Sequence, residues 1–517
     1  MDEASRALVS RKLKSAEEVA ALIGPRPRNR RVIMCHGTFD IVHPGHVRHL
    51  LYARTKADIL VASLTADVHI EKSNMRPYVP EALRAINLAA LEMVDYVIVD
   101  SERTPIVNIA LIRPDLFAKG YEYSAEGLHP RTLEEKVAVE AYGGEYIFTP
   151  GDVVYSSSAL IDLAPPRIAV EKLLSLIEAE GISFPDIRGV LSGLLGCKVH
   201  VVGDTIIDSY TACSAIGGMT KTPTMSLRFQ SKSDCVGGAG IVAKHLAAAG
   251  AEVLLSTVVG DDPLGRFALD DLRAAGVQCM AVVDATRPTT NKNAIVADGY
   301  RLFKIDTLDN RTIGDGVVSE FQRQLREGDS DAVVFSDFRH GIFNRTTIPL
   351  LTAAIPDRTF RVADSQVASR WGNILEFMNF DLITPNEREA RFALGDQDTV
   401  VRPLGLELYD RAGCGTLILK CSERGILTYR KADKNAMRSF FAVDSFAENV
   451  TDAVGAGDAL LAYATLAMVT TRNEVIASIL GSLAAAAECE HDGNRPITPA
   501  MVGGKLDALE KQARFSR

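Results

Sequence analysis

Residues 31–46, RVIMCHGTFDIVHPGH, place several groups that could handle phosphates directly after an apolar segment typical of a buried strand. If a helix begins at this point, the spacing of His43 and His46 puts both imidazoles on one face. The helix start adds free amides and partial positive charge, and Pro44 and Gly45 let the backbone approach a ligand closely. The pattern predicts a triphosphate cradle with two imidazoles beside the reacting phosphate.

The reaction that suits such a cradle is nucleotidyl transfer, in which an existing phosphate attacks the α-phosphorus of a nucleoside triphosphate. This chemistry needs little covalent help from the protein, because fixed donors stabilise the charge that builds on the equatorial oxygens. Lysine and arginine side chains hold the leaving pyrophosphate. In this otherwise acidic chain, the candidates for a local positive site are Lys72, Arg76, Arg84 and Lys119.

A second pattern, DAVGAGD at residues 452–458, suits phosphoryl transfer to a hydroxyl group. Small residues at a helix start, here Gly455, Ala456 and Gly457, present backbone amides to a transferring phosphoryl group. Asp458 can then accept the proton of the attacking hydroxyl. Glycine-rich helix starts are common, so this segment gains weight from an ordered set of polar and small residues elsewhere: Asp204, Asp208, Gly237, Gly238, Asp337, Asn386 and Glu389.

The elements around both patterns alternate between apolar strands and amphipathic helices. In the N-terminal part, helical segments separate the strand-like RVIMCHG, DILVASLT, DYVIVD and EYIFTP, and a second series begins at KVHVVGD. This alternation predicts two doubly wound parallel α/β domains, whose ligands bind at the carboxyl ends of the strands. We place the first domain at residues 1–164, a connector at 165–197 and the second domain at 198–517, with extended strands outside its main sheet near residues 220–230.

Charge and cysteine content exclude several classes of function. The net charge of −9 argues against a general surface for nucleic acid or anionic membranes. Eight scattered cysteines without a CxxC pair predict neither a zinc site nor a disulfide framework. No segment resembles a signal peptide or is apolar enough to span a bilayer, so we expect a cytoplasmic enzyme without nucleic-acid or membrane partners.

Residues 12–162 resemble the cytidylyltransferase-like nucleotidyltransferases, whose signature G-x-F-D-x-x-H-x-G-H matches residues 37–46. The resemblance implies transfer of a nucleotide from ATP or CTP, with catalytic roles for His43, His46 and Lys72. Arg84 matches the second arginine of the family's R-P…R pair. The implied contacts to nucleotide and phosphate are Gly37, Thr38, Phe39, Asp40, Asp67, Arg76, Lys119, Ser156, Ser157 and Ser158.

Residues 198–510 resemble the ribokinase-like sugar kinases through the ordered GD…D, GG, N-x-x-E and GAGD segments. The resemblance implies that Asp458 is the catalytic base, beside a phosphate-binding backbone at residues 455–457. It implies that Asn386 and Glu389 organise Mg²⁺ and phosphate, with Glu389 acting through water and no direct protein ligand to the metal. The implied sugar contacts are Asp204, Asp208, Gly237, Gly238 and Lys292.

The second domain also departs from the kinase pattern. Ile241 stands where G-G-x-x-N has an asparagine, which removes a polar sugar contact, and Val454 replaces the threonine before GAGD. The heptose-kinase branch has T-x-x-T-K-x-R, of which this chain keeps Lys292 but has Asn293. That branch also has Asp-Pro-Lys where this chain reads Asp-Ser-Gln at residues 364–366. These differences bear on the identity of the sugar more than on the type of reaction.

A sugar kinase joined to such a nucleotidyltransferase resembles the bifunctional ADP-heptose synthesis enzymes, in which the kinase domain usually comes first rather than second. The resemblance implies phosphorylation of a heptose phosphate at C1 and adenylyl transfer to the 1-phosphate, with Mg²⁺ and ATP as cofactors and a homodimer as the assembly. Two alternatives remain open. One is a nucleotidyltransferase whose kinase fold only senses sugar or dimerises; the other is a cytidylyltransferase that acts on a polyol phosphate.

Overall fold

The computed structural model describes residues 9–70, 77–120, 130–149, 168–217, 226–366, 372–431, 439–491 and 493–515. Predicted site residues Lys72, Arg76, Ser156, Ser157 and Ser158 lie outside these ranges. The chain divides into two compact units. The N-terminal unit comprises Met1–Leu176, Ala432–Phe440 and Ser516–Arg517, and the C-terminal unit comprises Ile177–Lys431 and Phe441–Phe515. The boundaries predicted at residues 164 and 198 stay predictions.

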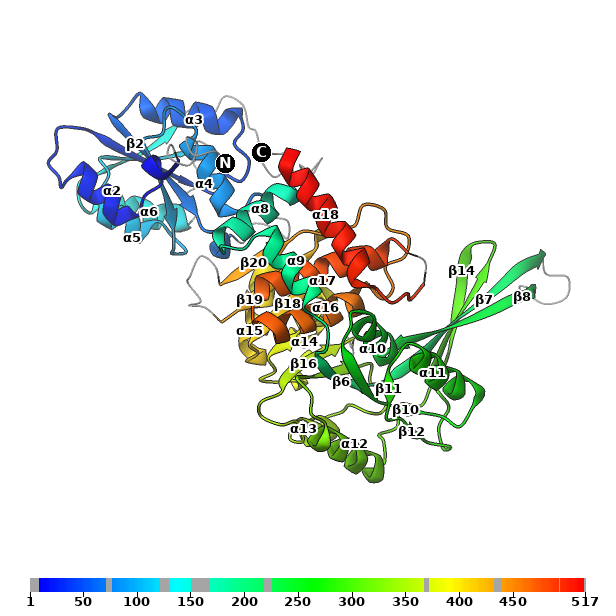
Figure 1. Cartoon of the computed structure of the whole chain (residues 1–517). Helices are drawn as coiled ribbons and strands as arrows, with labels where there is room; N and C mark the ends of the chain where they lie inside the picture. The colour runs from blue at the N-terminus through cyan, green and yellow to red at the C-terminus, as the bar shows by residue number, and fades with distance from the viewer. Residues whose placement is uncertain are drawn as a thin grey trace. The chain divides into compact units, whose positions relative to one another are not determined.

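The N-terminal unit is built on a five-stranded parallel sheet of order β3-β2-β1-β4-β5 (Figure 1). Its strands are β1 (Val32–Gly37), β2 (Ile59–Thr65), β3 (Tyr96–Asp100), β4 (Leu116–Gly120) and β5 (Glu145–Thr149). Its helices are α2 (Ala16–Ile23), α3 (Pro44–Arg54), α4 (Glu81–Ala89), α5 (Ile106–Ile112) and α6 (Pro130–Glu140). Ser15 caps α2 through a capping box with Glu18.

Both faces of this sheet are covered by helices, as the run of apolar strands predicts. Ile33 and Cys35 of β1 face a core that includes residues of α3 and α4, whereas Val32 and Met34 face a second core with residues of α2, α5 and α6. β1 pairs with β2 on one side and with β4 on the other, so the winding reverses between β1 and β4. Ligands of doubly wound sheets bind at this reversal, beyond the carboxyl ends of the strands.

The C-terminal unit contains a nine-stranded sheet of order β11-β9-β6-β15-β16-β17-β18-β19-β20. From β11 to β18 neighbouring strands pair in parallel, and β18 pairs with β19 antiparallel. The strands are β6 (Lys198–Gly203), β9 (Glu252–Ser256), β11 (Gln278–Cys279), β15 (Ala332–Asp337), β16 (Phe360–Ser365), β17 (Leu382–Ile383), β18 (Thr416–Lys420), β19 (Ile426–Arg430) and β20 (Phe440–Val443). A separate pair joins β10 (Val258–Val259) to β12 (Val282–Val283).

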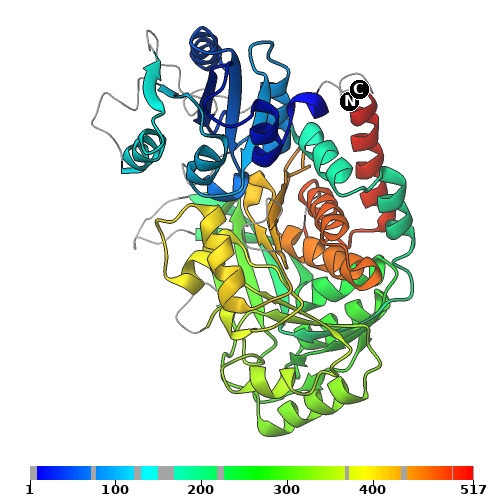
Figure 2. The same ribbon diagram turned by 90° about the vertical axis from the view of Figure 1, so that its left-hand side faces the viewer.

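Helices flank the nine-stranded sheet on both sides, and Figure 2 shows the yellow helices α14 and α15 on one side and the orange-red α16 and α17 on the other. This arrangement confirms the predicted doubly wound fold. The helices of this unit are α9 (Phe184–Ser192), α10 (Ala239–Ala248), α11 (Pro263–Ala274), α12 (Asp315–Glu327), α13 (Thr347–Thr352), α14 (Glu387–Leu394), α15 (Val401–Ala412), α16 (Ala456–Thr471), α17 (Glu474–Cys489) and α18 (Pro499–Phe515). The residues of α8 (Ala169–Ala179) are divided between the two units.

A four-stranded sheet of order β14-β13-β7-β8 lies outside the main sheet of the C-terminal unit and extends away from its layered body (Figure 1). It consists of β7 (Thr205–Gly217), β8 (Ser226–Gly238), β13 (Asn291–Ala297) and β14 (Tyr300–Thr307). The described part of the segment predicted as extended strands, residues 226–234, lies in β8. We refer to this sheet as the lid sheet.

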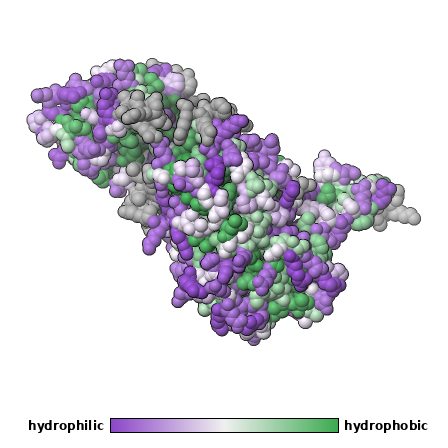
Figure 3. Space-filling model, in the orientation of Figure 1, coloured by the Kyte–Doolittle hydropathy of each residue, from purple (hydrophilic) through white to green (hydrophobic). Residues whose placement is uncertain are grey.

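The surface drawn in Figure 3 mixes hydrophilic and hydrophobic side chains, without a continuous hydrophobic belt on that face. Among the described ranges, the helices are all too short or too polar to cross a membrane. All eight cysteines lie among the described residues as free thiols.

Candidate active sites

The loop after β1 in the N-terminal unit contains a residue with positive φ and is anchored by a buried carboxylate. Phe39 has a φ of 48°, and its ring packs against Gly37, where a Cβ would lie 3.2 Å from the ring. Asp40 is buried and accepts backbone hydrogen bonds from Tyr78 at 2.9 Å and Val79 at 2.8 Å. Asp40 therefore ties the cradle loop to the segment that leads into α4.

His43 and His46 lie side by side at the start of α3, as their spacing predicts. Their ring centroids are 3.9 Å apart in a stacked arrangement. His43 is the N-cap residue, and its Nδ1 accepts a hydrogen bond from the Gly45 amide at 3.1 Å. His46 Nδ1 lies 3.0 Å from the carbonyl oxygen of Ile41, which can only accept, so this nitrogen carries a proton.

These bonds decide what each imidazole can offer a phosphate. With Nδ1 of His43 acting as an acceptor, the neutral ring carries its proton on Nε2 and donates from that atom. His46 already uses its Nδ1 proton, so it donates from Nε2 only when the ring is an imidazolium. The pair can thus present two donors to one phosphate, of which one brings a full charge.

Arg84, one of the four predicted members of the local positive site, is enclosed by the protein. Its side chain on α4 is 0% exposed, and its guanidinium donates to the carbonyl oxygens of Thr38 and Thr65, the latter at 2.9 Å. It also pairs with Asp67 at 2.6 Å. Arg84 therefore positions the cradle loop and Asp67, because both terminal nitrogens of its guanidinium donate to groups of the protein.

Lys119, at the end of β4, is nearly buried and pairs with Glu135 of α6 through both carboxylate oxygens, at 2.7 and 2.6 Å. Tyr146 donates to the same carboxylate at 3.2 Å. The strand end does place Lys119 at the predicted edge of the sheet, beside β1. A phosphate bound there must share the ammonium with Glu135, so the predicted phosphate contact stays a prediction.

Two further histidines lie close to polar side chains at the ends of the strands, and the sequence patterns did not single them out. His49 Nδ1 lies 2.8 Å from the hydroxyl of Thr149 at the end of β5, and burial lowers the pKa of His49 to about 4, so it stays neutral. His36 Nδ1 lies 2.9 Å from Ser63 Oγ and 3.1 Å from an oxygen of Asp100. The available signal was polar residues at the carboxyl ends of apolar strands.

In the C-terminal unit, the GAGD segment forms the start of α16 as predicted. Gly455 is the N-cap residue with a φ of 88°, a conformation that favours glycine. Asp458 is 7% exposed, and burial together with the neighbouring Asp364 carboxylate raises its pKa to about 8. Gln366 donates to Asp458 Oδ1 at 3.0 Å. The predicted base is thus buried at a helix start, where an approaching hydroxyl can lose its proton.

Lys420, at the end of β18, is a member of this site that the sequence analysis missed. Its ammonium donates to Asp364 Oδ1 at 2.8 Å, and a Cβ on Gly457 would lie 3.3 Å from the same nitrogen. Burial lowers the pKa of Lys420, but Asp364 and Glu389 outweigh burial and raise it above its ordinary value. The amine is therefore a fixed cation next to the phosphate-binding backbone.

Asn386 and Glu389 form the capping box of α14. The Glu389 carboxylate accepts from the Asn386 amide at 2.7 Å and from its side chain at 2.6 Å, and the Glu389 amide donates back to Asn386 at 2.9 Å. Burial, opposed by Lys420, raises the pKa of Glu389 to about 7. The N-x-x-E segment thus serves the helix and brings a buried carboxylate to the site.

These residues fit a hydrated Mg²⁺ ion better than an ion held directly by protein. Across the ranges that the structure describes, no group of three or more His, Cys, Asp or Glu side chains is arranged to hold a metal. However, Asp364 Oδ2 is buried without a hydrogen-bond partner, and Asp364, Glu389 and Asp458 surround one ammonium. Such an excess of carboxylates favours an additional cation, with water as the bridge.

The predicted sugar residues meet at the base of the lid sheet. Asp208 accepts a hydrogen bond from the side chain of Asn494 at 3.2 Å, and Gly237 is so close that a Cβ would lie 2.2 Å from Asp208 Oδ2. Lys292 lies opposite Asp208 in the register of β13 and β7, with its ammonium 5.2 Å from the centre of the Phe338 ring. The fold therefore brings Asp208, Gly237 and Lys292 together, and their contact with a sugar stays a prediction.

Asp204 and Gly238, the other two predicted sugar contacts, contact backbone groups of the protein, and their contact with a sugar stays a prediction. Asp204 is buried and accepts backbone hydrogen bonds from Phe338 at 3.1 Å and His340 at 3.2 Å. Gly238 has a φ of 60°, and a Cβ on it would lie 2.3 Å from the Asp204 carbonyl oxygen. Both residues hold backbone segments around the site, so their position favours a supporting role over direct contact with a sugar.

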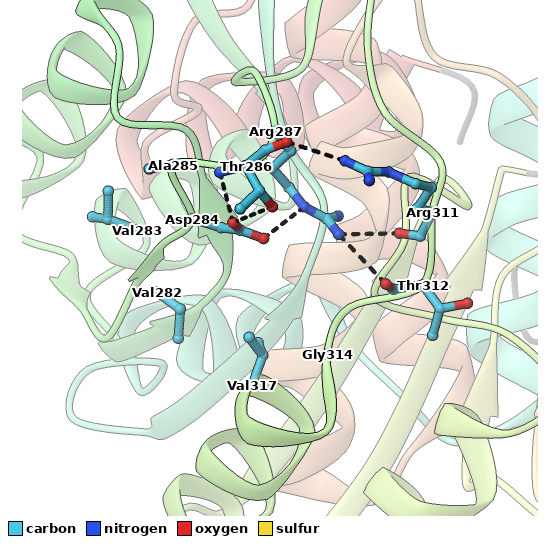
Figure 4. Close-up of a pocket in the computed structure, with 10 residues that line it drawn as sticks. All are labelled: Val282, Val283, Asp284, Ala285, Thr286, Arg287, Arg311, Thr312, Gly314 and Val317. Carbon is cyan, nitrogen blue, oxygen red and sulfur yellow. Dashed lines mark hydrogen bonds and ion pairs between the residues drawn. The ribbon is translucent and has the colours of Figure 1, made fainter.

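A pocket of about 440 Å³ lies elsewhere on the C-terminal unit, and Figure 4 shows its lining. Arg287 pairs with Asp284 at 3.0 Å, and Arg311 pairs with Asp309 at 2.5 Å. The two guanidinium groups also donate to backbone carbonyls across the pocket, at 3.2 Å and 3.0 Å. Because these charges are matched within the protein and the lining contains none of the predicted site residues, we assign no chemistry to it.

Comparison with known proteins agrees with the predicted order of the two chemistries. Residues 34–162 match the cytidylyltransferase-like family, and residues 197–501 match the pfkB family of carbohydrate kinases. Among solved structures, phosphofructokinase-2 from Escherichia coli in complex with potassium covers 61% of this chain and 100% of its own, with a TM-score of 0.51 and 16% identity. That likeness shows the fold of the C-terminal unit.

The similar curated proteins carry the name bifunctional protein HldE. The protein from Pelobacter propionicus is 40% identical over 136 residues, which are 26% of this chain and 27% of that protein. The protein from Geobacter metallireducens is 28% identical over 313 residues, which are 59% of this chain and 62% of that protein. In each case the chain covers less than two thirds of the relative.

The match to the kinase family extends over more than half of the 517 residues and includes every residue of the second predicted site. The GAGD helix start, the buried Asp458 and the Asn386–Glu389 pair all lie within it. The chain therefore belongs to the pfkB family of carbohydrate kinases and carries a cytidylyltransferase-like domain ahead of the kinase domain.

Proposed function

We propose that the chain is a bifunctional enzyme of sugar-nucleotide synthesis. The C-terminal unit phosphorylates a heptose-phosphate-like sugar at C1, and the N-terminal unit transfers an adenylyl group from ATP to the resulting 1-phosphate. The observation that carries the proposal is that one chain contains two arrangements suited to phosphate chemistry, the stacked His43–His46 pair and the buried Asp458 with Lys420 nearby. The partial similarity of the chain to proteins named HldE supports it.

In the N-terminal unit, an oxygen of the sugar 1-phosphate attacks the α-phosphorus of ATP in line with the leaving pyrophosphate. His43 donates from Nε2 and the imidazolium of His46 adds a charged donor, so both stabilise negative charge on the α-phosphate. The backbone amides at the start of α3 also favour negative charge at this position. Lys72 is proposed to hold the pyrophosphate, with Arg76 and the serines at 156–158 as further phosphate contacts.

In the C-terminal unit, Asp458 accepts the proton of the sugar hydroxyl as its oxygen attacks the γ-phosphorus of ATP. Asp208, aligned by Asn494, and Lys292 are proposed to orient the sugar. Asp364 and Glu389 would hold Mg²⁺ through water, and the ion, when bound, neutralises charge on the ATP phosphates. Gly455, Ala456 and Gly457 contribute backbone amides to the transferred group.

A second candidate function keeps the nucleotidyltransferase but not the kinase. It is favoured by two departures at the kinase site, because Ile241 is fully buried where the family pattern has a sugar-contacting asparagine and Val454 presents an apolar side chain beside the GAGD segment. In that case the C-terminal unit senses sugar or supports assembly. A cytidylyltransferase that uses CTP and a polyol phosphate is the third possibility tested below.

We further propose that the enzyme is a cytoplasmic homodimer that contacts its partner through the lid sheet. That sheet carries exposed apolar side chains, namely Ile216, Phe229, Phe303 and Ile305, which contact between two copies would remove from water. Light scattering coupled to gel filtration tests the assembly, with Phe229→Asp and Ile305→Asp expected to give monomers. A monomeric parent protein would contradict it.

The function is tested with purified protein and Mg²⁺, in separate reactions with ATP or CTP. Conversion of heptose 7-phosphate to an ADP-sugar shows that both sites work in sequence. If only heptose 1-phosphate is converted, the kinase half of the proposal is wrong. If CTP but not ATP supports transfer to a polyol phosphate such as glycerol 3-phosphate, the cytidylyltransferase alternative replaces it.

A further inference from the structure

Lys420 lies at the meeting point of three segments that the kinase chemistry uses. It follows the apolar strand β18, and its side chain extends toward the GAGD helix start. The carboxylates that act on its charge are Asp364 at the end of β16, Glu389 of the α14 capping box and the base Asp458. Its ammonium therefore pairs with Asp364 and lies beside the GAGD helix start.

The contact with Gly457 shows how closely Lys420 approaches the phosphate-binding backbone. A Cβ on Gly457 would meet Nζ of Lys420 at 3.3 Å and its Cδ at 3.7 Å. Gly457 is not among the glycines with positive φ, so its backbone conformation does not itself demand glycine. The absence of a side chain at Gly457 instead leaves space for the lysine beside the amides of the GAGD segment.

Gln366 is another side chain near Asp458, and it is neutral whereas Lys420 is charged. Gln366 contacts the base through a neutral amide, with 3.0 Å between Nε2 and Asp458 Oδ1. Burial and the carboxylates of Asp364, Asp208 and Glu488 raise the pKa of Asp458. The positive charge of Lys420 lowers it. A positive group thus reaches the site from β18, while the position after Asp364 and Ser365 supplies only a hydrogen bond.

We propose that Lys420 is a catalytic residue of the kinase site, whose ammonium binds the phosphoryl group during its transfer and is held toward that group by Asp364. This role rests on the proposed kinase function. The acceptor oxygen forms a bond to the γ-phosphorus as the bond to the β–γ bridging oxygen breaks. ADP leaves with that electron pair, and the hydroxyl proton passes to Asp458. Lys420 neutralises charge on the moving group throughout.

The first test needs no sugar. Beryllium fluoride added to Mg·ADP mimics the γ-phosphoryl group, so it should tighten the binding of a fluorescent ADP analogue to the parent protein. In Lys420→Met this tightening should fall by about tenfold or more, as expected for the loss of one charge-assisted hydrogen bond, while ADP alone binds unchanged. Equal tightening in both proteins would overturn the role of Lys420. No tightening in the parent protein would contradict the kinase half of the proposed function itself.

The second test separates contact with phosphate from simple neutralisation of Asp364. It is a double-mutant cycle of Lys420→Met and Asp364→Asn, read as the kcat for sugar phosphorylation. If Lys420 contacts the phosphoryl group, its loss lowers kcat by about 10²-fold in the Asp364→Asn background as well. If Lys420→Met has no further effect there, the lysine only balances Asp364 and the proposal is wrong.

Two controls show whether the effect of Lys420→Met is specific to the kinase site or arises from a loss of folding. Lys198→Met removes a lysine that pairs with Asp329 on the surface of the same unit, and it should leave the kinase reaction and unfolding temperature unchanged. Nucleotidyl transfer by the Lys420→Met protein should also remain normal. Loss of both activities, with a lowered unfolding temperature, would show that Lys420 acts through folding and would overturn the catalytic assignment.

Discussion

His43 and Asp458 show how burial and local hydrogen bonds adapt ordinary side chains to phosphate chemistry. The Gly45 amide bonds Nδ1 of His43 and leaves the proton on Nε2, so the ring becomes a donor. Asp458 is buried near other carboxylates, which raises its pKa to about 8 and makes it a stronger base than an exposed aspartate. In both cases the residue's surroundings decide its chemical role.

Replacing His46 by alanine should lower nucleotidyl transfer by about 10²- to 10³-fold, because a charged donor to the reacting phosphate is lost. Steady-state kinetics with the sugar 1-phosphate measures this effect. Phosphorylation by the C-terminal unit should be unchanged. Near-normal transferase turnover in a folded His46→Ala protein would contradict the role of His46.

Asp458→Asn is the reciprocal variant and should abolish sugar phosphorylation while nucleotidyl transfer continues. The amide cannot accept the hydroxyl proton, although it keeps the shape of the carboxylate and its contact with Gln366. If Asp458→Asn impaired both reactions equally, the two reactions would not occupy separate sites.

Each functional loop depends on the helix beside it. Helix α4 supplies Arg84, whose guanidinium holds the carbonyls of Thr38 and Thr65. Helix α14 begins with the capping box that fixes Glu389, and α16 begins at Gly455 in a left-handed conformation. The start of a helix thus has two tasks in this protein, which are to satisfy its own amides and to build a phosphate site.

Arg84→Met should destabilise the N-terminal unit by roughly 3–5 kcal/mol, because it leaves buried carbonyls and Asp67 without their donor. Denaturant unfolding measures the change in the free energy of unfolding. Arg31→Met is a suitable control, since its exposed pair with Glu145 should contribute less than about 1 kcal/mol. Similar effects of the two variants would show that Arg84 does not organise the loop.

Gly455→Ala should weaken phosphoryl transfer, because its φ of 88° strains any other residue and a Cβ would lie 2.9 Å from Glu488 Oε1. The expected destabilisation is about 1–3 kcal/mol, with a larger loss in kcat than in ADP binding. Gly316→Ala is the control, as open space surrounds that position on α12. Full kinase activity in Gly455→Ala would contradict the role of this helix start.

Taken as a whole, the C-terminal unit concentrates buried carboxylates that prefer to be protonated. Burial raises the pKa of Asp204, Glu389 and Glu488 to about 7 and that of Asp458 to about 8. Above about pH 4 the folded form therefore binds more protons than the unfolded form through these groups. Their contribution to stability is present at low pH and is lost as the pH rises through 7 to 8.

Buried histidines of the same unit have the opposite effect on the free energy of unfolding at lower pH. Burial lowers the pKa of His200 and His340 to about 4 and that of His245 to about 3. Their contribution to stability therefore grows as the pH rises toward 6.5 and is complete above it. Above pH 6.5 the carboxylates act without this compensation.

Above about pH 6.5 we expect the free energy of unfolding of the C-terminal unit to decline and then to level off near pH 8, where Asp458 is charged in the folded form as well. The slope is about 1.4 kcal/mol per pH unit for each group that is protonated in the folded form and charged in the unfolded form. Chemical denaturation at a series of pH values measures it. Asp458→Asn removes one of these groups and should make the decline shallower. Stability that rises over this range would show that these carboxylates remain charged in the folded protein.

The fold and the positions of both helix starts follow from local sequence. Apolar periodicity set the alternation of strands and helices, and residues 31–46 contain their strand, loop and helix start within one stretch. The GAGD segment and the Asn386–Glu389 pair are equally local, because caps and glycine turns act over a few residues. Sequence reasoning could therefore name the base, the histidine pair and the class of chemistry.

Tertiary structure alone decided which charges meet. In the sequence, Lys420 is only the polar end of an apolar strand, and Asp364 lies 56 positions before it. In the folded protein the two pair at 2.8 Å beside Gly457, and Gln366 comes to lie against Asp458. Likewise the sequence suggests Arg84 as part of a positive site and Asp204 as a sugar contact, and only the folded protein shows that both are buried and bonded to backbone groups. Periodicity and capping are short-range properties, whereas burial and electrostatic pairing depend on segments that the chain brings together only when it folds.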